Sequence, residues 1–476
     1  MASENKHNRR EFLSTAMAGI AAGGAALTPY WFTSSMARAA GSKNDRHAIG
    51  CIGTGDRWSG AIGPQVKNFG DIVAVCDVDR NHVEKNGLRI AGAKADTYED
   101  YRKVLDRNDI DIVTITTPDH WHSKICIEAM QAGKDIYCEK PLTLTIDEGK
   151  KICEVQKQTG RVVQVGTQQR SEFEVKNRET GEMKFNRQFL QAVALAHAGK
   201  LGKINTITCS IGGTDPCPPL PKVDVPDGLN WDLWQGQTPA VDYVQGGKSP
   251  SNPRYPSGRT HYEFRWWYEY SGGKLTDWGA HHVDIAQWVL GMDHSGPTSV
   301  EATATLPVPF DENGYPTVDN RYNTAKSFLV KCHYANGATI LIRPAPETGR
   351  WTEGLWIEGE DAAIFVSRNE FKDLRGTAVA DLAENPLPEA DLVKLFKGKS
   401  PTNHMQNFID CVADRSLPVS DVFTHHRAVT TCHLSNIAIR LKRSIQWDPE
   451  KEQIVADDQA NSFLAREQRK GYEIKV

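Results

Sequence analysis

Near its N-terminus the chain reads His47-Ala48-Ile49-Gly50-Cys51-Ile52-Gly53-Thr54-Gly55-Asp56-Arg57-Trp58-Ser59-Gly60. The first six residues form a short apolar run that predicts a buried β-strand. Gly53, Thr54 and Gly55 then predict the tight turn and close backbone approach that a pyrophosphate requires at a helix N-terminus. A dinucleotide fingerprint would place a third glycine at Trp58, so we expect Arg57 and Trp58 to cover the pyrophosphate or the nicotinamide instead. This motif is weak when it stands alone.

A second apolar strand, Asp71–Cys76, ends at Asp77. In nucleotide-binding βαβ units a carboxylate roughly 20 residues after the first glycine accepts the ribose hydroxyls, and its charge repels a 2′-phosphate. Asp77 therefore favours NAD as the cofactor, while Arg80 nearby leaves NADP open as an alternative.

The alternation of strands and helices continues to about residue 168. Strands are predicted at Ile110–Thr116, Asp135–Cys138 and Val162–Gly166, and helices at Tyr98–Leu105, Ser123–Ala132 and from the Thr145 capping box to Gly160. Because parallel strands end at one edge of a sheet, we expect the residues that follow them to face the cofactor. These residues are Thr117, Pro118 and His122 in one predicted turn, Glu139 and Lys140 in the next, and Gln168 in the last. The pattern predicts a doubly wound α/β domain over residues 46–168.

The second half of the chain has a different pattern. It predicts one helix at Phe185–Ala198, and strands at Ile204–Ile211, Val300–Val308, Ser327–Tyr334, Thr339–Ile342, Leu355–Glu358 and Ala363–Val366. We therefore expect an α+β domain over residues 169–445 with an open, mostly antiparallel sheet, in which Asn336-Gly337 forms a hairpin turn. Residues 212–260 lack periodicity and are expected to form a substrate wall or a subunit contact. The segment His404–Leu441 is predicted to be helical, and the tail, residues 446–476, is charged and unpatterned.

Asp277 and His281 lie one turn apart if the chain is helical from about Leu275. A carboxylate beside an imidazole is a proton-handling pair, in which the acid orients the ring and raises its basicity. The alternative is a buried Asp–His hydrogen bond at a helix start with no catalytic role.

Four motifs occur in the order Gly53-Thr54-Gly55, Thr117-Pro118-x-x-x-His122, Glu139-Lys140-Pro141 and Asp277-x-x-x-His281-x-x-Asp284. Together they resemble the glucose–fructose oxidoreductase / inositol dehydrogenase / MocA (Gfo/Idh/MocA) family over residues 46–445. The resemblance implies a Rossmann domain followed by a domain whose open sheet covers the substrate and often forms the dimer contact. It also implies three catalytic residues. Lys140 would polarise the reacting oxygen, His281 would be the general base, and Asp277 would orient or assist it.

Neighbouring residues allow more than one interpretation. We expect His282 to pack in the interior. The group Tyr262, Arg265, Trp266 and Trp267 would form either an aromatic floor for a sugar ring or part of the core. A metal site can be imagined from His261, Glu263, His281 and His282, but the family does not usually need a metal, and we expect none.

The N-terminal segment predicts export. Residues 8–14 form a twin-arginine pattern, residues 15–27 are mildly apolar, and Ala37-Arg38-Ala39 is a small-x-small cleavage site. We interpret residues 1–39 as a signal for Tat export to the periplasm. The net charge of −4 gives no electrostatic case for nucleic acid or for a membrane surface after cleavage, and the ten scattered cysteines indicate reduced core residues.

These observations lead to three hypotheses. The first is a sugar or polyol oxidoreductase with a tightly bound NAD, acting as a homo-oligomer (dimer or tetramer). The second is an NAD-dependent glycosidase or lyase that oxidises the sugar transiently. The third is a non-catalytic sugar-binding protein.

Overall fold

Six parallel strands form the sheet of the first half of the chain, in the order β3-β2-β1-β4-β5-β6. They are β1 (His47–Ile52), β2 (Gly70–Cys76), β3 (Asp96–Tyr98), β4 (Ile112–Ile115), β5 (Asp135–Cys138) and β6 (Val163–Val165). Every residue of β4, β5 and β6 is buried, as expected for parallel strands with helices on both faces. The order matches that of a dinucleotide-binding Rossmann sheet, which confirms the predicted doubly wound fold.

The computed structural model describes residues 46–171, 173–176, 183–345, 353–376 and 387–476, and Arg46–Val476 form one compact unit. The predicted export signal lies outside the described residues. No helix in the described ranges is long and apolar enough to cross a membrane.

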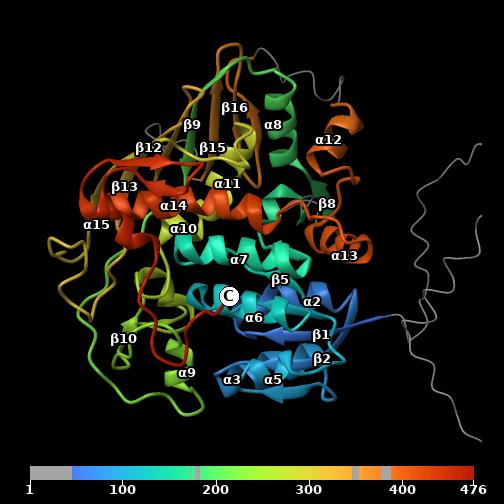
Figure 1. Ribbon diagram of the computed structural model, residues 1–476, viewed down its shortest axis with the longest axis vertical. Helices are drawn as coiled ribbons and strands as arrows, with labels where there is room; N and C mark the ends of the chain where they lie inside the picture. Colours follow the sequence, from blue (N-terminus) through green and yellow to red (C-terminus); the bar gives the residue numbers. More distant parts are fainter. Residues whose placement is uncertain (1–45, 172, 177–182, 346–352, 377–386) are drawn as a thin grey trace, which may run out of the picture. The chain divides into compact units, whose positions relative to one another are not determined.

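Helices connect the parallel strands (Figure 1). They are the π-helical turns η1 (Trp58–Ile62) and η2 (Val83–Gly87) and the helices α2 (Gly63–Val66), α3 (Arg80–His82), α4 (Leu88–Ala91), α5 (Arg102–Leu105), α6 (Asp119–Gln131) and α7 (Ile146–Thr159). The predicted cap of α7 is confirmed, because the Thr145 side chain accepts a hydrogen bond from the Glu148 N–H and Gly160 ends the helix in the left-handed region.

Two helix starts of the first domain differ from the prediction. Tyr98 pairs with Cys76 as part of β3, so α5 begins only at Arg102. Helix α6 begins at Asp119 directly after Pro118, so most of the predicted turn at residues 117–122 is helical. Proline fixes the backbone angle that suits a helix entry, and this favours the earlier start.

The second half of the chain forms a nine-stranded sheet in the order β17-β16-β15-β9-β14-β13-β12-β18-β19. Its strands are β9 (Ile204–Ser210), β12 (Ser299–Thr305), β13 (Ser327–His333), β14 (Thr339–Arg343), β15 (Gly354–Gly359), β16 (Ala363–Val366), β17 (Phe371–Asp373), β18 (Ile445–Asp448) and β19 (Gln453–Ile454). All neighbours are antiparallel except β9 and β14, so the predicted mostly antiparallel sheet is confirmed. Gly337 has a φ of +89° in the predicted hairpin turn between β13 and β14.

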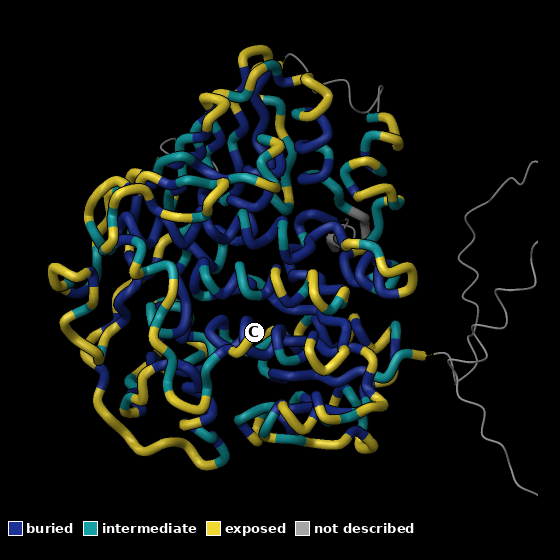
Figure 2. The backbone as a smooth tube through the Cα atoms, in the orientation of Figure 1, coloured by how far each residue is buried: buried dark blue, intermediate teal, exposed yellow. Residues whose placement is uncertain are grey.

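Three helices, α8 (Gln188–His197), α11 (Gly279–Val289) and α14 (Val422–Leu441), pack on this sheet and share its apolar core. The predicted helix at Phe185 begins later, at Gln188, because Met183–Asn186 forms β8 and pairs with β7 (Phe173–Lys176). Helix α14 also packs on α7 of the first domain, and it is dark blue over most of its length (Figure 2). It follows α13 (His404–Asp414) and thus divides the predicted helical segment in two.

Residues 212–260 pack against the Rossmann domain. They contain α9 (Trp231–Gln235), β10 (Gln245–Lys248) and β11 (Pro256–Gly258). The Trp234 carbonyl accepts a hydrogen bond from the Trp121 indole at 3.0 Å and lies 2.9 Å from a ring nitrogen of His120. This segment therefore covers the N-terminal end of α6, beside the carboxyl edge of the parallel sheet.

The tail, residues 446–476, is ordered by contacts that its sequence pattern did not indicate. It adds strands to the edge of the large sheet, forms α15 (Asp458–Asn461), and returns to α6, where the Lys124 ammonium donates to the Glu473 carbonyl at 2.9 Å. The C-terminus lies beside α6 in Figure 1. All ten cysteines are buried and free, as predicted.

Candidate active site

A cavity of about 980 Å³ opens at the carboxyl ends of the parallel strands. Its other walls come from residues 233–265, from the start of α11 and from the turn between β16 and β17. Of the predicted site residues, those that line it are Gly53, Gly55, Arg57, Asp77, Thr117, Pro118, Glu139, Lys140, Gln168, Asp277 and His281. The two domains therefore contribute to one site.

Lys140 and Asp277 form the central contact of this cavity. The Lys140 ammonium donates to Asp277 Oδ1 at 2.6 Å and to the Asp277 carbonyl at 2.8 Å, and both side chains are 12% exposed. Arg265 Nε lies 3.5 Å from the same carboxylate oxygen. Burial alone would raise the pKa of Asp277, but these two cations hold it far below its ordinary value. The carboxylate is therefore ionised and keeps Lys140 in place.

His281 lies on the same wall with an unused ring nitrogen. It is 5% exposed, and within the described part of the chain its Nδ1 has no hydrogen-bond partner. Burial, followed by the positive charges of Lys140 and Arg368, holds its pKa well below 6.5. The imidazole is thus neutral at neutral pH. Because Nδ1 is buried, the nitrogen that can accept a proton from the cavity is Nε2.

The predicted pairing of Asp277 with His281 is wrong. Trp278, between α10 (Lys274–Asp277) and α11, keeps right-handed helical angles, so Asp277 and His281 remain one turn apart. The Asp277 carboxylate nevertheless binds Lys140 and lies 3.5 Å from Arg265 instead of orienting the imidazole. His282 is fully buried and stacks on Trp278, as expected for a packing residue.

The cofactor end of the cavity fits NAD. A Cβ at Gly53 would lie 2.7 Å from the backbone of Thr116 and Thr117, so this turn, with a φ of +81°, needs glycine. Asp77 accepts hydrogen bonds from the Thr54 N–H at 2.7 Å and the Asp79 N–H at 3.0 Å.

The charge of Asp77 at this end of the cavity also fits NAD. Burial would raise the pKa of Asp77, but His82 and the backbone donors lower it, so the carboxylate keeps the charge that binds ribose hydroxyls. The Thr117 Oγ1 is buried and has no partner among the described residues.

Glu139 is held by protein groups. It forms an ion pair with Arg57 at 2.8 Å and accepts a hydrogen bond from Gln168 at 3.0 Å. Burial would raise its pKa, but the charges of Arg57 and Lys140 lower it. Arg57, Glu139 and Gln168 thus form a connected polar group next to Lys140.

Three predicted cofactor residues do not line the cavity. Trp58 is fully buried in the core under Gly63, where an added Cβ would meet the indole at 2.8 Å, so it does not cover the pyrophosphate. The π-helical turn at Trp58–Ile62 turns this side chain inward. Thr54 is buried and acts through its backbone on Asp77, while His122 lies between the carbonyls of Pro141 and Thr117, 2.6 and 2.9 Å away. These three residues are buried and support the residues that line the cavity.

The aromatic group is divided between two environments. Tyr262 and Arg265 line the cavity, with the guanidinium 4.6 Å from the ring centre, whereas Trp266 and Trp267 are buried in a separate aromatic cluster. The core interpretation is thus correct for Trp266 and Trp267, and a sugar-binding role for Tyr262 and Arg265 stays a prediction.

The imagined metal site does not assemble. Glu263 is buried against the Tyr322 hydroxyl at 2.6 Å. Among the described residues, His261 instead lies near Asp79 and His82, with potential ligand atoms within 4.8 Å of one another. This cluster is at the ribose end of the cavity.

Several residues that line the cavity are not among the predicted site residues. They include Asp119, Trp234, Tyr255, Arg368 and Asn369. Arg368 and Asn369 come from the turn between β16 and β17, which has no local motif. Tyr255 bonds to Asp56 beside the glycine turn and stacks on Tyr262, with ring centres 5.1 Å apart. Only the folded chain brings these groups to the cavity.

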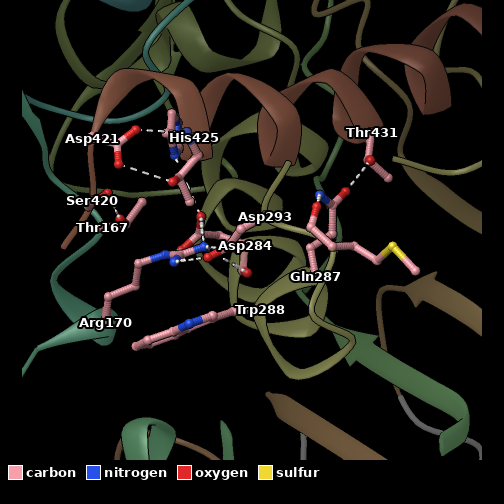
Figure 3. A network of polar contacts seen from close by, with 12 residues as sticks. Thr167, Arg170, Asp284, Gln287, Trp288, Asp293, Ser420, Asp421, His425 and Thr431 are labelled. Atoms are coloured by element: carbon pink, nitrogen blue, oxygen red, sulfur yellow. Dashed lines mark hydrogen bonds and ion pairs between the residues drawn. The ribbon is translucent and has the colours of Figure 1, made fainter. Parts of the chain in front are cut away.

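A second charged network fixes α11 further along the helix (Figure 3). Arg170 donates to Asp284 at 2.6 and 3.0 Å and to Asp293 at 2.8 and 3.0 Å, and its guanidinium lies 4.6 Å from the centre of the Trp288 ring. Arg170 follows the last strand of the Rossmann sheet, so this network ties that sheet to the helix that carries His281.

Comparisons with known proteins agree with this architecture. Residues 48–167 match the NAD-binding Rossmann fold, and residues 217–474 the C-terminal α/β domain, of the Gfo/Idh/MocA oxidoreductase family. The first domain therefore binds NAD.

Individual relatives match over shorter stretches. A glycosyl hydrolase family 109 protein of Shewanella pealeana is 34% identical over 32% of this chain and 38% of its own length. An inositol 2-dehydrogenase of Klebsiella pneumoniae is 32% identical over 25% of this chain and 36% of its own length. The crystal structure of the WlbA dehydrogenase from Bordetella pertussis with NADH and UDP-GlcNAcA has a TM-score of 0.55 at 18% identity, covering 85% of this chain and 99% of that one. By the match of both domains, the chain is a member of the Gfo/Idh/MocA oxidoreductase family.

Proposed function

We propose that this protein transfers a hydride between a tightly bound NAD and a hydroxyl or carbonyl group of a sugar or polyol. The observation that carries the proposal is the 2.6 Å contact of Lys140 with Asp277 beside a neutral His281, in the cavity that begins at the Gly53 turn. The partial match to an inositol 2-dehydrogenase supports the same substrate class.

The chain's own residues suit alcohol oxidation. Two N–H groups of the Lys140 ammonium bind Asp277, and the third remains for the substrate oxygen, where its charge stabilises the developing alkoxide. His281 accepts the hydroxyl proton. NAD, when bound, supplies the acceptor for the hydride that leaves the substrate carbon. Gly53, Gly55 and Asp77 would hold it there.

The test is reduction of the protein-bound nicotinamide by a panel of sugars and polyols, followed by its absorbance, after mass spectrometry has identified the co-purified nucleotide. Reduction by at least one member of the panel, lost in Lys140→Ala, is the expected result. A bound nucleotide that no sugar or polyol reduces would contradict the proposal.

Cleavage of a glycosidic bond is the second candidate, favoured by the partial match to a glycosyl hydrolase family 109 protein. Oxidation at one sugar carbon acidifies the neighbouring C–H, so a base in this cavity would allow elimination of a substituent before the sugar is reduced again. Release of nitrophenol from nitrophenyl glycosides, without net change in the cofactor, would favour this activity. A purely sugar-binding role would require loss of function in a site where Lys140, Asp277 and His281 are all retained, and the absence of any bound nucleotide would favour it.

We also propose that residues 1–39 direct Tat export to the periplasm, on the grounds of the twin-arginine pattern and the cleavage site. Because the periplasm has no free NAD pool, the cofactor would stay bound and be re-oxidised in place by a second substrate. Replacing Arg9 and Arg10 with lysine should retain the protein in the cytoplasm, as cell fractionation would measure.

The assembly is proposed to be a homo-oligomer, a dimer or tetramer, formed through the large sheet. Strand β13 alternates buried and exposed residues, and its exposed face includes Leu329, which is 36% exposed. Light scattering of the purified protein, with Leu329→Lys as the variant that should reduce the mass, tests this arrangement.

A further inference from the structure

Five lysine and arginine side chains line the cavity. Arg254 lies at the cofactor end, because the hydroxyl of its neighbour Tyr255 bonds to Asp56 beside the glycine turn. Of the other four, at the substrate end, three are paired. Arg57 pairs with Glu139 at 2.8 Å, and Lys140 and Arg265 share Asp277 at 2.6 and 3.5 Å. The fourth is Arg368. Its guanidinium has no carboxylate within ion-pair distance in the part of the chain that the structure describes.

Arg368 is held in position without an ion pair. Its guanidinium lies 4.6 Å from the centre of the Trp278 ring, and its carbonyl accepts a hydrogen bond from the Asn186 side chain at 3.0 Å. Stacking on an aromatic face fixes the plane of a guanidinium but leaves its N–H groups available. The residue is therefore oriented but not satisfied.

The charge of Arg368 reaches the reacting groups. It is one of the charges that lower the pKa of His281, and Asp277 and Glu139 act in turn on the pKa of Arg368, which burial lowers. Glu353 also acts on it from beyond ion-pair distance. A half-buried cation at this place gains most from a ligand anion that replaces its lost hydration.

The chemistry of that anion follows from the donor set. A guanidinium presents two parallel N–H groups that match the two oxygens of a carboxylate. Asn369, the next residue, also lines the cavity and offers an amide. The other three cations near this end already have carboxylate partners. Arg368 is therefore the guanidinium there whose two parallel N–H groups remain available to a substrate carboxylate.

We propose that Arg368 binds a carboxylate group of the substrate, so that the sugars accepted by this protein are acidic ones, uronates or aldonates. This inference rests on the proposed function and names its substrate class. Lys140 and His281 would act on a hydroxyl of the same molecule while Arg368 holds its carboxylate end.

Calorimetric binding of matched sugar pairs to the NAD-loaded protein tests the inference without turnover. Glucuronate is compared with glucose, and galacturonate with galactose. The wild type should bind one uronate at least about tenfold more tightly than its neutral partner, because a charged hydrogen-bonded pair is worth roughly 1.5–3 kcal/mol. Arg368→Gln should lose about 10- to 100-fold in uronate affinity and change the affinity for the neutral sugar by less than about threefold.

Two further variants separate charge from geometry and from general effects on the hairpin. Arg368→Lys keeps the charge without the fork and should recover only part of the uronate affinity. Arg375→Gln removes another arginine near the same hairpin, whose guanidinium binds the Gly359 carbonyl at 2.9 Å and does not line the cavity. It should leave both affinities unchanged.

The outcomes distinguish this inference from the proposed function. If neutral sugars reduce the bound cofactor and uronates show no advantage, the inference is wrong and the proposed function stands. If uronates bind through Arg368 but no sugar reduces the cofactor, the proposed function is wrong and the inference stands. Equal losses for both sugars in Arg368→Gln, or weaker NAD binding in that variant, would assign Arg368 to the cofactor or to the fold and overturn the inference.

Discussion

The start of α11 and its middle are both surrounded by charge, but the two regions differ in how far that charge is satisfied. Around Asp284, Arg170 uses its N–H groups on two carboxylates and lies against Trp288. Around His281, the Arg368 guanidinium lines the cavity and has no carboxylate partner among the described residues. A saturated buried network holds elements together, whereas an unsaturated one beside a cavity leaves groups free for a ligand.

The saturated region is also the drier one. The Arg170 and Asp284 side chains are 1% and 0% exposed, against 12% for both Lys140 and Asp277. Burial makes an intact ion pair roughly neutral for stability but makes the loss of one partner costly. Mutations in the two regions should therefore fail in different assays, one in folding and the other in catalysis.

The largest effect is expected from Lys140→Ala, which removes the cation from the reacting oxygen. We expect kcat/KM to fall about 10³- to 10⁴-fold, as for the loss of an electrostatic and proton-handling group, with a small change in melting temperature. Steady-state kinetics and thermal unfolding measure both quantities.

Lys134 provides the matched control for that variant. It is 5% exposed, and its ammonium donates to the carbonyls of Arg107 and Ile110 at 2.6 and 3.0 Å, away from the cavity. Lys134→Met should lower the stability and keep the activity per folded molecule. If both lysine variants lost stability and activity to the same degree, the distinction between the two regions would be wrong.

Asp284→Ala tests the saturated network. It leaves Arg170 with Asp293 alone, and removing one partner of a buried pair typically costs about 3–5 kcal/mol. Chemical denaturation should report this loss in the free energy of unfolding. Asp109→Ala, which breaks an ion pair at a carboxylate that is 61% exposed, should change it by less than about 1 kcal/mol. An equally small loss for Asp284→Ala would show that the network contributes little.

The sequence was sufficient for features that depend on local pattern. Buried strands of the Rossmann sheet appear as continuous apolar runs, the Asn336-Gly337 turn requires a positive φ, and Thr145 is followed by a glutamate three residues later. Each of these signals acts within a few residues. They predicted the fold and the strand ends that face the cavity, but only a minority of the residues that line it.

The features that were predicted wrongly or not predicted at all depend on contacts between residues that are distant in sequence. Trp58 occupies a fingerprint position, but its indole enters the core. Asp277 stands one turn from His281 in sequence, yet its partner is Lys140, 137 residues away. Arg368 reaches the cavity only because a hairpin of the large sheet brings it to Trp278. Spacing along the chain carries no information about such partners.

His281→Gln tests the cavity region through the pH dependence of kcat/KM. Burial and the nearby cations hold the pKa of His281 below 6.5, so the neutral base is available throughout the neutral range. The acid limb of kcat/KM in the wild type should therefore lie below pH 6.5. The variant should lose about 10²- to 10³-fold in kcat/KM and should lack this limb. An acid limb that persists unchanged in His281→Gln would assign the proton transfer to another residue.

The smallest effect is expected at His82, which lies in the cavity wall but is paired. Burial lowers its pKa, but the bond to Asp77 at 3.3 Å and the charges around it raise the pKa to about 8. A histidine whose folded pKa is raised adds stability that is fully present below pH 6.5 and is lost as the pH rises through about 8. His82→Asn should therefore lower the free energy of unfolding by about 1 kcal/mol at pH 6 and have little effect at pH 9. Denaturation at the two pH values measures this difference.

Because Asp77 also accepts two backbone N–H groups, the carboxylate should remain ionised in the variant, and NAD affinity at pH 9 should be unchanged. A stability loss that is the same at both pH values would mean that His82 stabilises the fold by packing and not by its charge. The pair of His82 and Asp77 would then resemble the saturated network around Asp284, which holds elements together, and not the groups that are free for a ligand.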